Sequence, residues 1–245
     1  MQEESVYQER AQEGAAGRDD LAVQFSGLAR TLQQQDDAQS TLVEIVRAAV
    51  QLIPGSEEGS ISTVVGRRQV RSEVPSGDLA RALDELQEQT GQGPCLDAVY
   101  QHDTVLVTDL ASERRWPRFA ERACAAGAGS MLAFQLYVDG DNLGALNLYA
   151  RSAGAFDDES EHVGQLFAAH AALAYEGARK QAGLARSVAS RQVIGQAQGI
   201  LMERHKVTAD QAFAMLVRVS QYSNTKLRNI AEQLIRSGVL PPAQP

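Results

Sequence analysis

The sequence predicts an α+β domain with an antiparallel sheet and flanking helices, followed by a long helix and a small three-helix domain. Three observations predict this. Short apolar segments bounded by turn residues follow Pro54-Gly55, which is typical of strands. No proline lies between Pro117 and Pro241, so that a long helix has room from about residue 158. Short amphipathic segments with capping signals then close the chain.

The α+β domain is assigned to residues 19–157, and the polar residues 1–18 before it are expected to be disordered. It begins with a helix capped by Asp19 or Asp20 and a second helix over Leu42–Ile53. After these, the expected strands are "GSISTVVG", "RQVRSEVP", "TVLVTDL" and the two arms of "SMLAFQLYV-DGDN-LGALNLYA", and the expected helices are "DLARALDELQEQ" and "RFAERACAA".

Residues 158–189 are expected to form the long helix, with Asp157 and Asp158 available to cap its start. A seam with 3-4-3 spacing resembles that of a coiled coil. It comprises Val163, Leu166, His170 and Leu173, and then weakens to Gly177, Lys180 and Leu184. We expect this helix to pair with a second copy of itself, because a long helix with an apolar seam needs a partner. The alternative is a helix that packs only on its own domain.

Residues 190–245 are expected to contain three short helices, of which the first covers Arg191–His205. Thr208 and Gln211 fit a capping box at the start of the second helix. Ser223 or Asn224 is expected to cap the third, and Gly238 with Pro241-Pro242 to end it. The expected inward-facing residues are Val193, Ala197, Ile200, Leu201, Ala212, Met215, Leu216, Val219, Leu227, Ile230, Ala231 and Leu234.

Charge is unevenly distributed along this acidic chain, whose net charge is −8. From Arg186 onward, eight basic and three acidic residues give +5, which leaves −13 for the rest. A basic C-terminal part predicts that any binding of a polyanion occurs there. No apolar run could span a bilayer and the N-terminus does not look like a signal peptide, so we expect a cytoplasmic protein without membrane contact.

The sequence contains no recognisable catalytic or metal-binding motif, so we expect no enzyme activity, no metal and no cofactor. Its two cysteines, Cys95 and Cys124, do not make a disulfide framework. Cys95 lies in "GQGPC", which permits a redox or chromophore role, but a lone cysteine is more often a buried apolar residue.

The C-terminal stretch "RQVIGQAQGILMERHKVTADQAFAMLVRVSQYSNTKLRNIAEQLI" resembles the ANTAR domain, an RNA-binding module of bacterial transcription antiterminators. The resemblance covers about residues 185–240. Three upstream stretches are similar to a GAF domain of the kind fused to ANTAR in actinobacteria. These stretches are "GQGPCLDAV", "TDLASERRWPRFAERACAAGAGSMLAFQLYVDGDNLGALNLYA" and "GAFDDESEHVGQLFAAHAALA". The ligand of this GAF-like domain is not specified, and the Asn-Lys…Phe-Asp-Glu set typical of cyclic-nucleotide binding is missing.

The resemblance implies an RNA-binding regulator of transcription antitermination. Such proteins bind tandem stem-loops in nascent mRNA leaders and favour an antiterminator over an overlapping terminator, so that polymerase reads on. A homodimer would hold the two hairpin loops, and the RNA polymerase elongation complex is a further partner that this mechanism allows. The expected RNA-binding residues are Arg191, Gly195, Gln198, Met202, Ser220, Tyr222, Asn224, Lys226 and Arg228.

The chemistry of these residues suits an RNA loop, in which unstacked bases are open to side chains. Basic side chains neutralise phosphates, short amides and hydroxyls reach base edges, and Tyr222 can stack on a base. Structural interpretations remain beside the functional ones: Asn224 as a helix cap, Met202 as core, and Gly195 as a helix-packing position. Two rival functions are a DNA-binding regulator with a helix-turn-helix-like C-terminus and a small-molecule sensor that acts through protein partners.

Overall fold

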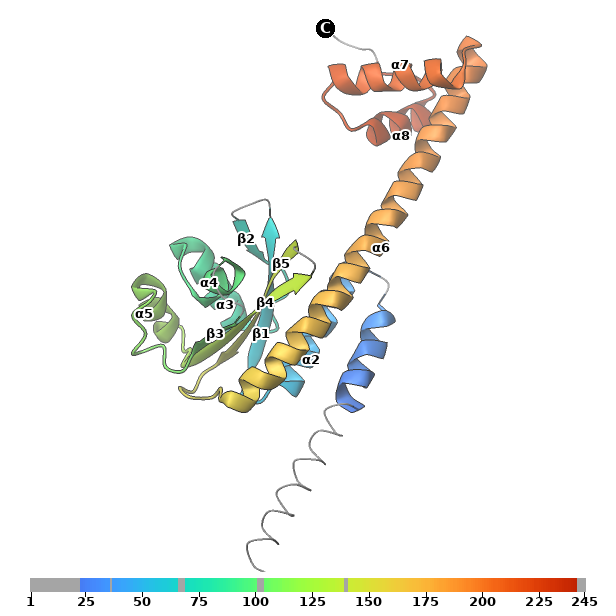
Figure 1. Ribbon diagram of the computed structural model, residues 1–245. Coiled ribbons are helices and arrows are strands. Elements are labelled where there is room, and N and C mark those ends of the chain that lie inside the picture. The colour runs from blue at the N-terminus through green and yellow to red at the C-terminus, as the bar shows by residue number, and fades with distance from the viewer. Residues whose placement is uncertain (1–22, 36, 66–68, 101–103, 139–140, 242–245) are drawn as a thin grey trace, which may run out of the picture. The chain divides into compact units, whose positions relative to one another are not determined.

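The structure is a computed structural model that describes residues 23–35, 37–65, 69–100, 104–138 and 141–241. The chain divides into two compact units between Arg179 and Lys180. One helix, α6 (Asp158–His205), belongs to both units (Figure 1). In the described residues, no helix is long and apolar enough to cross a membrane.

Two helices open the first unit. Residues 23–33 are helical, and the expected caps Asp19 and Asp20 lie outside the described residues. Helix α2 (Ala38–Leu52) starts four residues earlier than the sequence predicted, because the carboxylate of Asp37 accepts hydrogen bonds from the backbone amides of Gln39 and Ser40.

The strands form an antiparallel sheet in the order β2-β1-β5-β4-β3, as expected for its class. The bounds are β1 (Glu58–Val65), β2 (Gln69–Ser72), β3 (Thr104–Val107), β4 (Ser130–Val138) and β5 (Asp141–Ala150). The hairpin predicted between the last two strands is confirmed, with Ser130 opposite Ala150. Asp141 and Asn142, expected in the turn, already belong to β5, and residues 139–140 between the strands lie outside the described part.

Side chains of the sheet alternate between two apolar cores. On one face, Phe134 and Leu148 pack with α2 and the first half of α6. On the other face, Met131 and Tyr149 pack with helices α3 (Asp78–Thr90), α4 (Pro94–Tyr100) and α5 (Pro117–Ala125). Because both faces are covered, β4 and β5 are buried almost throughout, and their sequences read as continuous apolar runs.

Helix α4 was not predicted from the sequence. It has seven residues and starts at Pro94, directly after Gly93, so its sequence carries turn signals and too few turns to establish a helical period. Burial of Cys95, Ala98 and Val99 against the sheet stabilises this helix. Tertiary packing therefore decides its conformation.

Helix α6 runs without interruption over 48 residues, whereas the sequence analysis divided it near residue 190. Asp157 caps it as expected, with its Oδ1 2.9 Å from the amide nitrogen of Ser160. Gly164 allows close packing on the sheet, since an added Cβ would lie 2.1 Å from the ring of Phe134. The helix contributes to the core of each unit, and no proline separates the two segments, so the backbone hydrogen bonds continue.

The predicted seam of α6 is only partly available to a partner. Val163 is buried in the core of its own unit, which corrects its assignment to a free seam. The imidazole of His170 lies 5.3 Å from the ring of Phe25. Leu166, Leu173 and Leu184 are 43%, 61% and 69% exposed. These leucines therefore leave apolar surface on the helix.

The second unit joins the end of α6 to α7 (Ala209–Tyr222) and α8 (Leu227–Ser237). The capping box of Thr208 and Gln211 is present, and Gly238 ends α8 with a φ of 68°, as predicted. Pro242 lies outside the described residues. The predicted inward-facing residues all contribute to one small core, the buried ones being Ala197, Leu201, Ala212, Leu216, Val219, Ile230, Ala231 and Leu234.

A buried polar network crosses the core beneath α3. Its centre is the carboxylate of Asp84, which accepts hydrogen bonds from the hydroxyls of Ser60 (2.9 Å), Ser72 and Tyr149. Burial raises the pKa of Asp84 to about 6, and the three hydroxyl donors oppose a larger rise. Ionised Asp84 is therefore a cost to the fold at neutral pH.

Next to this carboxylate is a cavity of about 20 Å³, which suits one water molecule. The Nε2 of Gln87 is buried and has no hydrogen-bond partner among the described residues, while its Oε1 accepts from the amide of Cys95. Burial raises the pKa of the Cys95 thiol to about 12. A thiol in such surroundings stays protonated at neutral pH and is a poor nucleophile.

The raised pKa of Asp84 predicts a pH-dependent stability of the sheet domain. Its contribution is fully present below the unfolded-state pKa of about 4, and it is lost as pH rises through about 6. Relative to Asp84→Asn, the wild type should gain about 1 kcal/mol of unfolding free energy between pH 7.5 and pH 5. Urea titrations that follow the single tryptophan, the buried Trp116, measure this difference. Parallel pH profiles of the two proteins would contradict it.

Candidate nucleic-acid interface

The connection from α7 to α8 is a tight, hydrogen-bonded turn. Ser220 Oγ donates to the carbonyl oxygen of Thr225 (2.6 Å), and Asn224 adopts a left-handed conformation with a φ of 48°. Asparagine tolerates this conformation better than most residues. The backbone of the turn is therefore fixed by residues that the sequence analysis had assigned to RNA contact.

The expected cap of α8 is wrong. The residue at its N-cap is Lys226, which makes no side-chain capping bond. Ser223 instead ends α7, and its hydroxyl donates to the carbonyl of Val219 (2.8 Å). The local reason is that Asn224 turns left-handed, so that the chain needs two further residues before helical geometry resumes.

Three side chains of this turn are exposed to solvent. Tyr222 is 63% exposed, and Asn224 and Lys226 are exposed too. Within the described part of the chain, none of the three makes a side-chain hydrogen bond or ion pair. Arg228 differs, because its Nε lies 2.8 Å from the carboxylate of Glu232. An exposed pair of this kind contributes little to stability and exchanges readily for another anion.

The other predicted residues lie along α6. Arg191 and Gly195 are exposed, and Met202 is 37% exposed, so the interpretation of Met202 as a core residue is not supported. Gln198 Nε2 donates to the carbonyl of Ala209 at the start of α7 (3.1 Å). Gln198 therefore links two helices of the unit.

The helical glycines of this region leave open space where a side chain would lie in the described part of the chain. A Cβ added at Gly195 or Gly199 would meet no atom within 4 Å among the described residues. Packing within the chain therefore does not explain these glycines. Each costs roughly 1 kcal/mol of helix stability against alanine, and each leaves helix backbone bare to an approaching molecule.

The predicted site residues form two groups. Gln198 is bonded to the first residue of α7, whereas Tyr222 is the last residue of this 14-residue helix. A rise of about 1.5 Å per residue separates the two ends of α7 by about 20 Å. Gln198 and the turn therefore contact a ligand only if that ligand spans this distance.

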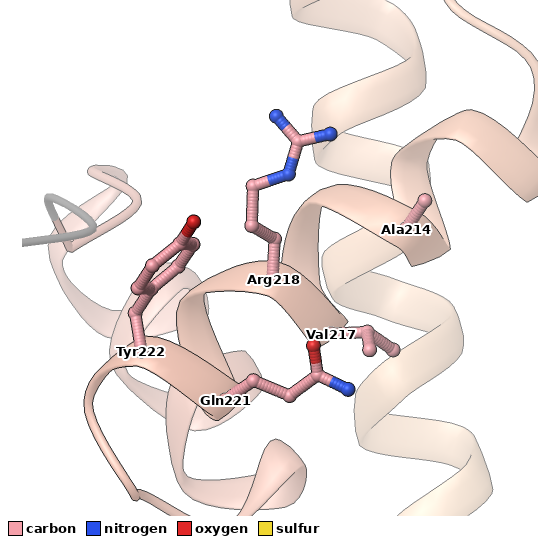
Figure 2. A pocket seen from close by; sticks show the side chains of 5 residues that line it. All are labelled: Ala214, Val217, Arg218, Gln221 and Tyr222. Carbon is pink, nitrogen blue, oxygen red and sulfur yellow. The ribbon is translucent and has the colours of Figure 1, made fainter.

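A hollow on α7 was not predicted from the sequence, although one of its lining residues, Tyr222, was predicted to bind RNA. Ala214, Val217, Arg218, Gln221 and Tyr222 line a volume of about 470 Å³. Figure 2 shows the side chains of Arg218 and Tyr222 extending to the same side of the helix. The available signal was the spacing i, i+3, i+4, i+7, i+8, which places the five residues along one face of the helix.

The basic residues of the second unit differ in how they are engaged. Arg204 donates to the carbonyl of Gly238, Lys206 pairs with Glu203, and Arg228 pairs with Glu232. Four other basic side chains make no hydrogen bond or ion pair with any described residue; they are Arg191, Arg218, Lys226 and Arg236. The four unengaged cations are free to neutralise an anionic ligand without breaking an internal bond.

Two family models match the chain, and together they cover both units. The GAF domain matches residues 35–176, and the ANTAR domain matches residues 182–235. The chain belongs to the GAF domain family and carries a C-terminal ANTAR domain. This is the architecture of an RNA-binding antitermination regulator with a GAF sensory domain, and it fits a regulator rather than an enzyme.

Solved structures share the fold at low sequence identity. Free methionine-R-sulfoxide reductase from Neisseria meningitidis is 18% identical, with a TM-score of 0.51 over 63% of this chain and 87% of its own. The GAF domain of a phosphoenolpyruvate-protein phosphotransferase from Coxiella burnetii is 14% identical, with a TM-score of 0.52 over 66% and 96%. A bacteriophytochrome from R. palustris is 11% identical, with a TM-score of 0.57 over 82% and 46%. No curated protein matches the chain.

The left-handed turn predicts how Asn224 variants behave. Asn224→Gly should keep the stability of the C-terminal unit, whereas Asn224→Val should lower it by about 1–2 kcal/mol, since a branched side chain disfavours this conformation. Hydrogen–deuterium exchange of peptides from residues 206–241 reports the change for this unit alone. If both variants exchange like the wild type, the turn does not need the left-handed residue.

Proposed function

We propose that the protein is a homodimeric transcription antiterminator whose ANTAR domains bind tandem hairpins in nascent mRNA leaders. Binding stabilises an antiterminator at the expense of an overlapping terminator, and the GAF domain modulates it. The observation that carries the proposal is the turn of the ANTAR domain, which presents Tyr222, Asn224 and Lys226 without internal side-chain partners among the described residues.

The turn supports recognition of a hairpin loop rather than of a duplex. Sequence-specific RNA binding mostly targets unpaired bases, which stack on aromatic rings and offer their edges to amides. Tyr222 supplies a ring, Asn224 an amide and Lys226 a charge within five residues. Because hydrogen bonds of the turn already fix its backbone, little conformational entropy is lost when the loop binds.

The exposed helix backbone at Gly195 and Gly199 supports a second line of contact. RNA phosphates and sugars can approach a helix closely where no Cβ intervenes. Arg191, one turn before Gly195, adds a charge without an internal partner in the described chain. A structured RNA about 20 Å across would reach both this stripe and the turn.

Apolar surface on α6 supports a dimer. Leu173, Leu184 and Val188 are 61%, 69% and 64% exposed, and the first two continue the heptad seam predicted from the sequence. A helix segment with such residues gains stability when a second helix covers them. A dimer would also present two ANTAR domains to two hairpins, which raises affinity through effective concentration.

A regulatory role suits the GAF domain better than catalysis does. One protein of similar fold is a reductase, an enzyme. In this chain, burial raises the pKa of the thiols of both Cys95 and Cys124. Neither thiol is an activated nucleophile. The buried carboxylate of Asp84 instead provides a group whose protonation depends on its burial and on the hydroxyls that donate to it.

The proposal is tested by the affinity of the purified protein for a tandem hairpin RNA, a single hairpin and duplex DNA over a salt series. Lys226→Gln and Arg228→Gln should each weaken tandem-RNA binding by about tenfold or more, since each removes a phosphate contact. Glu232→Gln, which releases Arg228, should keep or raise the affinity.

The matched control is Arg236→Gln, which removes the same charge from an exposed residue of α8 outside the predicted site. It should weaken binding only a few-fold. Wild-type affinity of both the Lys226 and Arg228 variants would refute the assigned contacts. Equal, steeply salt-dependent binding to all three nucleic acids would indicate general polyanion attraction and would favour the DNA-binding or docking rivals.

Alanine at the bare glycines separates stability from binding. Gly195→Ala and Gly199→Ala should each raise the thermal stability of the ANTAR domain, by up to about 1 kcal/mol, because alanine is the better helix former. The same substitutions should weaken tandem-RNA binding, because the new methyl group holds the RNA away from the helix.

Gly183→Ala is the control for this pair. Gly183 lies in the same helix, and a Cβ there also meets nothing within 4 Å, but it lies outside the predicted site. It should stabilise the helix without a change in the affinity for a single hairpin, which does not depend on pairing of two copies. If all three variants bind RNA equally well, the RNA does not approach the helix backbone at Gly195 and Gly199.

A further inference from the structure

The hollow on α7 combines an apolar floor with polar walls. Ala214 and Val217 provide the aliphatic part, and Arg218, Gln221 and Tyr222 the polar part, with Arg218 and Tyr222 on one side of the helix and Gln221 beside Val217 (Figure 2). It faces away from the domain core, and its five residues come from successive turns of one helix. Its shape is therefore set by a rigid helix rather than by a loop.

None of the three polar side chains of this hollow is engaged within the described chain. Arg218 and Gln221 are exposed and make no side-chain hydrogen bond, and Tyr222 is 63% exposed. These groups retain their full hydrogen-bonding and stacking capacity for a ligand.

We propose that this hollow binds one unpaired nucleobase of the RNA, so that the ANTAR domain reads the loop on α7 as well as at the turn. The inference rests on the proposed RNA-binding function and extends it to Arg218 and Gln221. Tyr222 stacks on the base, the guanidinium of Arg218 covers it or holds its phosphate, and the Gln221 amide bonds its edge. Ala214 and Val217 offer the base aliphatic surface to contact.

Charge complementarity selects RNA among the possible occupants. The only charged residue that lines the hollow in the described chain is Arg218, and the chain from Arg186 onward carries +5. Tyr222 belongs to both the hollow and the turn that presents Asn224 and Lys226, so the two surfaces are continuous. A loop held at the turn therefore has its neighbouring nucleotides next to the hollow.

The test combines protein variants with abasic RNA. Binding of the full-length protein is measured with a tandem hairpin RNA whose unpaired nucleotides are replaced one at a time by abasic residues. One such replacement should weaken wild-type binding by about tenfold. Gln221→Ala and Tyr222→Leu should weaken binding to the intact RNA to a similar extent, and they should be insensitive to that same abasic replacement.

Two control variants are matched to this design. Arg236→Gln removes one positive charge outside the hollow and should keep the full abasic effect, whereas Arg218→Gln should reduce it. Tyr222→Phe keeps the ring and should stay within a few-fold of the wild type. All of these residues are exposed, and melting curves identify any variant that fails to fold.

The possible failures are distinguishable. If the wild type binds tandem RNA tightly and every abasic RNA affects the wild type and the variants equally, base binding in the hollow is refuted while the proposed function stands. If the variants bind RNA like the wild type but no longer support antitermination, the hollow contacts a protein, and the inference is overturned. If the wild type does not prefer tandem RNA at all, both proposals fail.

Discussion

Both folded units of this protein depend on the unbroken backbone hydrogen bonding of α6. The helix contributes Phe167 and Ala171 to the core of the GAF domain and Ala197 and Leu201 to the core of the ANTAR domain. The ANTAR core consists of eight buried apolar residues, which is little for an independent domain. A helix that is already anchored in a larger domain lowers the entropy that the smaller one must lose on folding. The two cores are therefore coupled through one continuous element.

The part of α6 between the two cores has no core of its own. Residues 180–188 are exposed or half-exposed and include Leu184 and Val188. Apolar side chains on an exposed helix are stabilised when a second helix covers them. In the proposed dimer, this segment would both pair the two copies and join the GAF domain to the ANTAR domain. A signal that alters helix pairing would reach both domains through the same backbone.

In the proposed RNA-binding surface, some residues build the structure and others are left free for contact. Gln198 joins α6 to α7 through a hydrogen bond to Ala209, and Ser220 closes the turn through a hydrogen bond to Thr225. Arg228 is paired with Glu232. Tyr222 and Lys226 have no such role among the described residues. A rigid turn built by one set of side chains lets the other set meet RNA at low entropic cost. The acidic GAF domain and the basic ANTAR domain further direct a polyanion to the C-terminal unit.

The sequence by itself determined the sheet class, the hairpin of β4 and β5, the capping box at Thr208 and the inward stripe of the ANTAR helices, because these follow from local periodicity and capping chemistry. Tertiary structure decided the rest. Helix α4 depends on burial against the sheet. Val163, which was predicted to lie in the seam, is buried in the core of its own unit. The split of the site into two groups arises from how the helices of the second unit pack, with Gln198 bonded to the start of α7. Local sequence records which side of a helix is apolar, but not which neighbour covers it, and that choice is made only when the chain folds.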